Sequence, residues 1–213
     1  MPASDLLKNT MATSAGGVIT HLSLLTALSD TAPTEVTGGA PAYARKATTA
    51  WSTAAAGITT APSVAVTFDV PAGTTVLAIG FHSAVTAGNY HGWSPLNGSA
   101  ATQGFGTVDA AGVTADLIVS AAHGLTTNDY VVVNNVAGST LPTGLTETTV
   151  VYRVIATGLT ADAFKLSTTQ GGSAVDITAA GELWFQKLIP EVYGSQGTLS
   201  VAINAVTLDL NAI

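Results

Sequence analysis

The sequence contains no cysteine and very little charge. Six Lys or Arg and 13 Asp or Glu are present among 213 residues, so 9% of the chain is charged, against about 25% in an ordinary soluble domain. The lack of cysteine excludes disulfides, thiolate zinc sites and cysteine nucleophiles. We therefore expect a fold that is stabilised by packing alone.

Positive charge and long apolar runs are also scarce. The formal net charge is −7, and no basic patch is present to replace phosphate counterions, so we expect no nucleic-acid partner. The longest apolar runs, such as Val76–Phe81, fall far short of the roughly 20 residues that span a bilayer. The first 17 residues lack the basic start and apolar centre of a secretion signal. We expect neither a membrane segment nor a secretion leader.

The residues that are abundant favour extended chain. Hydrophobic residues make up 47% of the sequence, and many of them are Ala and Val, while polarity comes from Thr, Ser, Asn and Gly. These polar residues favour strands and turns over helices. Because few charges keep molecules apart in solution, self-association into a homo-oligomer is expected. A soluble monomer with a Thr- and Ser-rich surface is the alternative.

One helix is predicted, at the N-terminus. Ser4 can cap its first turn, and Leu6, Leu7 and Met11 fall on one side at helical spacing. Two consecutive glycines end the pattern. We expect residues 1–17 to form an arm with a short helix, whose apolar side is a candidate interface with a neighbouring subunit.

The rest of the chain alternates apolar and polar residues in short runs between Gly and Pro turns, as in sandwiches and barrels. Predicted strands cover residues 18–24, 43–51, 64–70, 76–83, 90–95, 117–119, 130–133, 149–155, 163–167, 174–177 and 182–188. The tail, Thr198–Leu210, predicts two further strands, because the alternation slips at Asn204 and Ala205.

Two modules are predicted within an all-β fold. Gln103–Gly106 reads as a loop, and Pro190 marks a second boundary. We expect a β-sandwich of the jelly-roll type, formed by residues 18–103 and 188–213, to be split by an inserted small β-barrel-like domain at residues 104–187. Insertion of a domain is tolerated best at an exposed loop tip.

Several blocks of sequence resemble those of a family of tailed-bacteriophage virion proteins. They are EVTGGAPAYARK at residues 35–46, VTFDVPAGTTV at residues 66–76 and GWSPL at residues 92–96. A further phage pattern, with HGLTTND, LPTGL and FKLS, occurs within residues 104–187. This second pattern resembles a small β module of tail fibres and other exposed virion proteins.

The resemblance implies a non-enzymatic component of the virion, assembled in the bacterial host cytoplasm. Family members include tail-fibre, minor tail and minor capsid proteins. Our preferred hypothesis is an oligomeric decoration or minor capsid protein that stabilises the head, with its own copies (as trimers at local threefold positions) and the major capsid protein as partners. The alternative is a minor tail or tail-fibre-associated protein that contacts tail proteins and adheres to a host glycan.

The sequence shows no recognisable active site. His82 and His91 flank a predicted hairpin, but two ligands are fewer than zinc sites use. His123 lies in a predicted turn and is expected to support that loop. No G-x-S-x-G motif occurs. We expect no enzymatic activity, no metal and no cofactor. Two carboxylate pairs can be considered, although turn capping explains each more simply: Asp109 with Asp116, and Asp129 with Glu147.

Aromatic and cationic side chains complete the candidate interface. Arg45 and Lys46 are candidates for an inter-subunit contact or, alternatively, for a solvated strand edge protected by charge, and Trp93 is a third candidate. The aromatic residues can fill cores and subunit interfaces or, in the adhesin alternative, form a platform on which a sugar stacks. These residues are Tyr43, Trp51, Tyr90, Trp93, Trp184 and Phe185.

Overall fold

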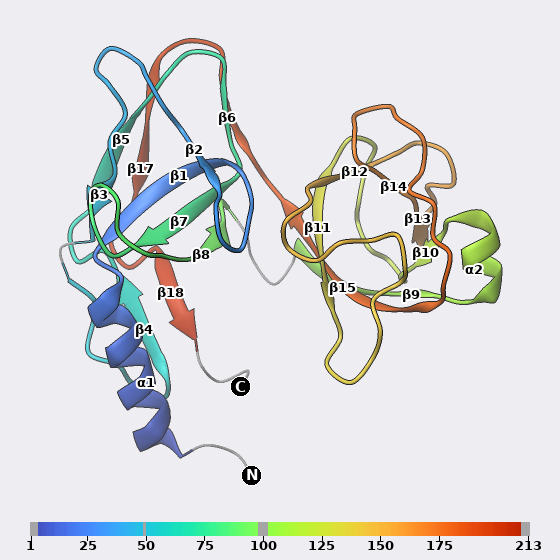
Figure 1. Ribbon diagram of the computed structural model, residues 1–213, viewed down its shortest axis with the longest axis horizontal. Helices are drawn as coiled ribbons and strands as arrows, with labels where there is room; N and C mark the ends of the chain where they lie inside the picture. The colour runs from blue at the N-terminus through green and yellow to red at the C-terminus, as the bar shows by residue number, and fades with distance from the viewer. Residues whose placement is uncertain (1–3, 49, 98–101, 210–213) are drawn as a thin grey trace. The chain divides into compact units, whose positions relative to one another are not determined.

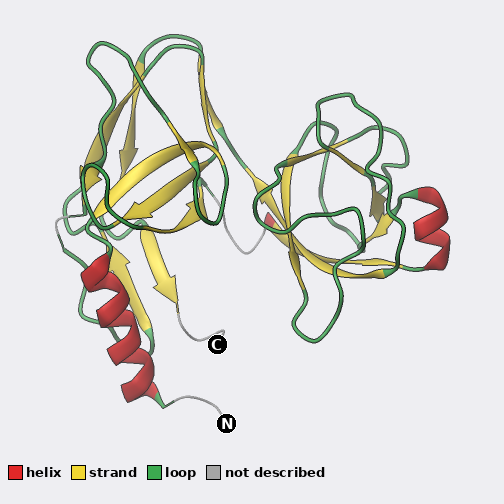
Figure 2. Ribbon diagram, in the orientation of Figure 1, coloured by secondary structure: helices red, strands yellow, loops and turns green. Residues whose placement is uncertain are grey.

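The computed structural model describes residues 4–48, 50–97 and 102–209, which divide into two compact units (Figure 1). Unit 1 consists of the chain up to residue 26, residues 31–94 and the chain from residue 191, and unit 2 consists of residues 27–30 and 95–190. The regular elements of both units are mainly strands (Figure 2). The predicted all-β class with a short N-terminal helix is therefore confirmed. Neither helix of the described part is long and apolar enough to cross a membrane.

Unit 1 contains a five-stranded sheet with the order β2-β1-β7-β8, in which β3 also pairs with β1. The strands β1 and β7 are antiparallel, with Leu22 opposite Phe81 and Leu24 opposite Ile79, and all four side chains are buried. The predicted strand over residues 43–51 is wrong except at its centre, because only Lys46 and Ala47 pair with β1. The five strands are β1 (His21–Ala27), β2 (Thr34–Glu35), β3 (Lys46–Ala47), β7 (Ala78–His82) and β8 (Tyr90–Pro95).

Three two-stranded ladders complete unit 1, and each joins an early strand to a late one. The pairs are β4 (Ile58–Ala61) with β18 (Val206–Asp209), β5 (Val66–Val70) with β17 (Gly197–Val201), and β6 (Thr74–Val76) with β16 (Glu191–Tyr193). The slip in alternation predicts the turn between β17 and β18 correctly, since Ala205 donates its N–H to the carbonyl of Ala202. Leu210, the end of the predicted strand, lies outside the described residues. The C-terminal segment thus belongs to the same core as residues 58–76.

The helix α1 (Asp5–Val18) starts as predicted, since the Ser4 hydroxyl accepts a hydrogen bond from the N–H of Leu7 at 3.4 Å. It ends later than predicted, because both glycines continue the helix. Gly16 packs directly against Trp51: a Cβ added at Gly16 would lie 2.9 Å from the indole ring. The glycine therefore allows close packing of α1 on unit 1 instead of terminating the helix.

Unit 2 contains a seven-stranded sheet with the order β13-β10-β9-β15-β11-β12-β14. The sheet is not closed into a barrel, but its two outermost strands, β13 and β14, are separated in the chain only by Lys165. One short segment therefore borders both ends of the sheet. The elements are β9 (Gln103–Val108), α2 (Ala110–Ala115), β10 (Ile118–Val119), β11 (Tyr130–Asn135), β12 (Tyr152–Val154), β13 (Ala163–Phe164), β14 (Leu166–Ser167) and β15 (Gly181–Leu188).

The predicted loop at residues 103–106 is in fact part of β9, which pairs with β15 over six residues. Its glycines suggest a loop, yet they are there for packing. A Cβ at Gly104 would lie 2.2 Å from the Phe185 ring. The core enclosed by this sheet consists of Val108, Ile118, Leu125, Val131, Val133, Leu145, Tyr152, Val154, Phe164, Leu166, Ile177, Leu183 and Phe185.

Candidate functional site

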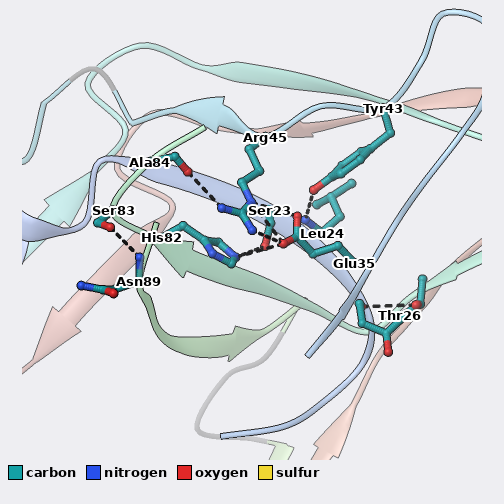
Figure 3. A network of polar contacts seen from close by, with 11 residues as sticks. Ser23, Leu24, Thr26, Glu35, Tyr43, Arg45, His82, Ser83, Ala84 and Asn89 are labelled. Atoms are coloured by element: carbon teal, nitrogen blue, oxygen red, sulfur yellow. Dashed lines mark hydrogen bonds and ion pairs between the residues drawn. The ribbon is translucent and has the colours of Figure 1, made fainter. Parts of the chain in front are cut away.

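One group of polar contacts in unit 1 surrounds an ion pair between Arg45 and Glu35 (Figure 3). The Arg45 Nε atom donates to both carboxylate oxygens of Glu35, at 3.1 and 3.0 Å, and Nη1 donates to the carbonyl of Ala84 at 3.0 Å. The two side chains are only 16% and 20% exposed. A planar guanidinium is suited to such bidentate contact. The pair joins the start and the end of the EVTGGAPAYARK block.

His82 and Ser23 extend this group into the core. The Ser23 hydroxyl lies 2.9 Å from Nε2 of His82, and a Glu35 oxygen lies 3.6 Å from the same nitrogen. Burial, and next the nearby Arg45 charge, lower the pKa of His82, so the ring is neutral at pH 7. A proton on Nε2 leaves only a lone pair unpaired on Nδ1, which has no hydrogen-bond partner among the described residues.

The Ser23–His82–Glu35 group differs from a hydrolase triad. In a triad the acid contacts one ring nitrogen and the nucleophile contacts the other, whereas here both contact Nε2. Ser23 is also completely buried. The geometry is that of a structural hydrogen-bond network.

The loop between Glu35 and Arg45 is held by two further side chains. The N–H of Leu24 donates to the Tyr43 hydroxyl at 2.8 Å, and the Tyr43 ring stacks on Phe68. The Gln196 side chain accepts from the N–H of Ala40 and donates to the carbonyl of Pro41, both at 3.0 Å. Every one of these contacts lies within unit 1. The block that carries the family resemblance therefore forms a loop that these contacts hold against β1.

The candidate interface residues differ in how accessible the structure leaves them. Arg45 is engaged in its internal ion pair, while Lys46 on β3 and Trp93 on β8 are half-buried. On α1, by contrast, Leu6, Leu7 and Met11 are 78%, 51% and 41% exposed.

The helix α1 buries small side chains and exposes large ones. Its fully buried positions are Ala12 and Gly16, whereas Leu6, Leu7, Met11 and Val18 are exposed. An ordinary surface helix shows the opposite arrangement, with its large apolar side chains toward the core. An exposed set of apolar side chains of this kind is a candidate interaction surface.

The acidic residues considered for catalysis all bind backbone amides. Asp109 caps α2 by accepting from the N–H of Gly112, and Asp116 accepts from the N–H of Ile177. Asp129 accepts from the N–H of Thr126 and pairs with Lys187, and Glu147 accepts from the N–H of Asn135. Among the described residues no group of three metal-ligating side chains occurs.

His123 supports its turn, as its position in the sequence suggests. Its Nδ1 accepts from the N–H of Leu125 at 3.0 Å, which places the proton on Nε2, 3.3 Å from the carbonyl of Ala163. The ring also packs edge-on against Phe164.

The six aromatic residues considered as a sugar platform serve different purposes. Phe185 belongs to the core of unit 2 and Tyr43 to the loop contact described above. The Trp51 indole N–H donates to the carbonyl of Ile19 at 2.8 Å. Trp184, in contrast, is 49% exposed and packs edge-on against Phe105. The sequence does not identify Phe105 as a candidate, because residues 103–106 are interpreted as a loop.

Comparison with known proteins gives one family. The family model described as Podophage GP4 fiber I protein gp80 matches residues 4–114, just over half of the chain. No curated protein and no solved structure matches the sequence or the fold. The match supports a structural component of the phage virion. The chain belongs to the family of the podophage GP4 fiber I protein gp80.

Proposed function

We propose that the chain is a structural subunit of a phage tail fibre, held in the virion by the exposed face of α1. The family match carries the proposal, because the family is that of a fibre protein. It supports the tail-fibre alternative of the sequence analysis better than the head-decoration hypothesis that the sequence analysis preferred.

The apolar face of α1 supports attachment to a neighbouring subunit. Leu6, Leu7 and Met11 project from unit 1 without contacts that would bury them, and covering them with a partner removes apolar surface from water. A stable complex buries roughly 800 Å² on each partner, and the candidate face of α1 consists of only three side chains. Attachment through α1 therefore requires other contacts or several copies acting together, in which case multivalency strengthens the whole. Copies of this chain and other tail proteins are the partners proposed.

The proposal gives the two units different roles. The ion pair and the Gln196 contacts fix the EVTGGAPAYARK loop in unit 1, the unit that also carries α1. The β-rich unit 2 contains the exposed aromatic pair Phe105–Trp184. We assign attachment to unit 1 and contact with the host surface to unit 2.

Fractionation of the particle tests the location. Purified virions and tailless heads from the same phage are compared by quantitative mass spectrometry, with the major capsid protein as the internal standard. We expect peptides of this chain in complete virions and none in heads. Equal amounts per capsid protein in both fractions would support head decoration and contradict the fibre proposal.

A further inference from the structure

The outer face of the seven-stranded sheet carries a row of exposed side chains. Phe105 on β9 lies directly opposite Trp184 on β15, and Trp184 lies directly opposite Asn134 on β11. The two rings are 5.4 Å apart and edge-on, with 38% of Phe105 and 49% of Trp184 exposed. Residues directly opposite one another in a ladder share one face of the sheet. Three neighbouring strands thus present two aromatic rings and an amide side by side.

The next row of the same face adds polar and apolar groups. Thr107 lies opposite both Glu182 and Val119. Val119 is exposed, and Thr107 and Glu182 are half-exposed. Because side chains alternate along a strand, Thr107 shares its face with Phe105, and Glu182 shares its face with Trp184. The result is a small apolar centre bordered by a hydroxyl, an amide and a carboxylate.

The exposure of two large aromatic side chains, Trp184 and Phe105, is unusual. Trp and Phe are residues whose burial contributes most to a core, and the inner face of the same strands is filled by Leu183 and Phe185. The core of unit 2 is complete without Trp184 and Phe105, which are absent from it. A function outside the core explains their exposure better than packing does.

We propose that this face binds a neutral saccharide, with a sugar ring stacked on Trp184 and Phe105. The C–H face of a pyranose is apolar and suits an aromatic ring, and its hydroxyl groups need donors and acceptors around the ring. Asn134 supplies both kinds of group, and Glu182 supplies acceptors. This inference rests on the proposed function, since it names what the host-facing unit of a fibre would contact.

Other ligands fit the face less well. Single-stranded nucleic acid also stacks on aromatic rings, but it needs cations along its backbone. The register places one cation on this face, Arg153, which packs over the Tyr130 ring, and the charged side chain next to the aromatic pair is Glu182. The same carboxylate disfavours acidic sugars. The apolar centre consists of only three side chains, Phe105, Val119 and Trp184, which is small for the core of a stable protein interface.

Binding of the full chain to immobilised oligosaccharides tests the proposal. The probes are neutral oligosaccharides of glucose, galactose, rhamnose and N-acetylglucosamine, with oligogalacturonate as the acidic counterpart. We expect saturable binding of at least one neutral probe and weaker binding of oligogalacturonate. The variant W184T should lower the affinity about tenfold or more, as loss of a central aromatic contact does, and W184F should retain most of it.

Two controls separate a lost site from a lost fold. The variant V192T changes an exposed strand residue of unit 1, 72% exposed, and should bind as the natural chain does. Circular dichroism should show the same unfolding temperature for W184T and W184F. The proposal would be overturned if the natural chain bound none of the neutral probes, or if W184T bound them as tightly as the natural chain does. A change in oligomeric state caused by W184T would also overturn it. None of these results alters the fractionation of the virion, so the fibre location and the saccharide site can fail separately.

Discussion

At the scale of single residues, this chain places its few charged groups in specific structural contacts. Arg45 and Glu35 are mostly buried, and the carboxylate accepts hydrogen bonds from both Nε and Nη2 of the guanidinium. The chain has only six Lys or Arg residues, and one of them, Arg45, holds the loop that carries the family resemblance. Breaking such a pair leaves one charge buried without compensation.

The variant E35Q tests the contribution of this pair to stability. We expect the free energy of unfolding to fall by about 3 kcal/mol, because Arg45 stays largely buried without its counter-charge. Denaturant unfolding followed by circular dichroism measures the change. The matched control D69N alters a half-exposed acid on β5 and should change the unfolding free energy by about 0.5 kcal/mol or less. Equal effects of the two variants would show that the ion pair is dispensable.

His82 predicts a pH dependence with a definite sign. Burial first, then Arg45, His91 and His21, lower its pKa from the ordinary value of 6.5, and only Glu35 acts in the other direction. The unfolded chain therefore binds a proton at a higher pH than the folded chain does. The stability from neutral His82 is present above pH 6.5 and is lost as the pH falls through the lowered pKa.

Nuclear magnetic resonance can follow this titration directly. The ring nitrogens of His82 should retain the chemical shifts of a neutral imidazole at pH 6.5, the ordinary pKa of histidine. The variant H82Q should show a smaller loss of stability between pH 7.5 and pH 5 than H91Q does. A His82 ring that is charged at pH 6.5 would contradict this prediction.

At the scale of elements, the glycines of α1 determine how closely the helix lies on unit 1. A Cβ at Gly16 would meet Trp51 at 2.9 Å, whereas nothing lies within 4 Å of a Cβ at Gly17. We expect G16A to lower the free energy of unfolding by about 1–3 kcal/mol through overpacking. G17A should raise it by up to about 1 kcal/mol, since alanine favours the helix. Thermal unfolding of both variants checks the pair, and destabilisation by both would contradict the packing described for α1.

The exposed face of α1 gives a second prediction at this scale. Replacing Leu6, Leu7 and Met11 together by Gln keeps helix-forming residues and removes the apolar face. The unfolding temperature should stay close to that of the natural chain, because these side chains are exposed. Incorporation into virions, measured by complementing a phage that lacks the natural chain, should fall severalfold. Unchanged incorporation would remove α1 from the proposed attachment, and V192Q provides the matched exposed control.

The sequence predicts some elements well because local signals determine them. Ser4 capping, the strand at residues 90–95 and the turn after β17 follow from capping, alternation and parity. The strand β9 could not be predicted, because Gly104 is required by the ring of Phe185, which lies far away in the sequence, and Gly106 by Ile118 on the neighbouring strand β10. The Phe105–Trp184 pair was missed for the same reason, since only the register of β9 with β15 brings them together.

At the scale of the whole molecule, each unit is assembled from separated stretches of chain. The C-terminal strands pair with residues 58–76, so the three two-stranded ladders of unit 1 can form only after residues 95–190 have been synthesised. That residues 104–187 are an inserted domain able to fold by itself remains a prediction. A fragment of residues 95–190 that unfolds cooperatively on heating, followed by circular dichroism, would support it, and a fragment without a cooperative transition would contradict it.

The central claim is that this chain is a fibre subunit of the virion. Immunogold labelling of intact particles tests it most directly, with an antibody raised against the whole chain and viewed by electron microscopy. We predict gold particles on the tail fibres, and none on particles of a phage that lacks the chain. Gold distributed over the surface of the head, with unlabelled fibres, would contradict the account.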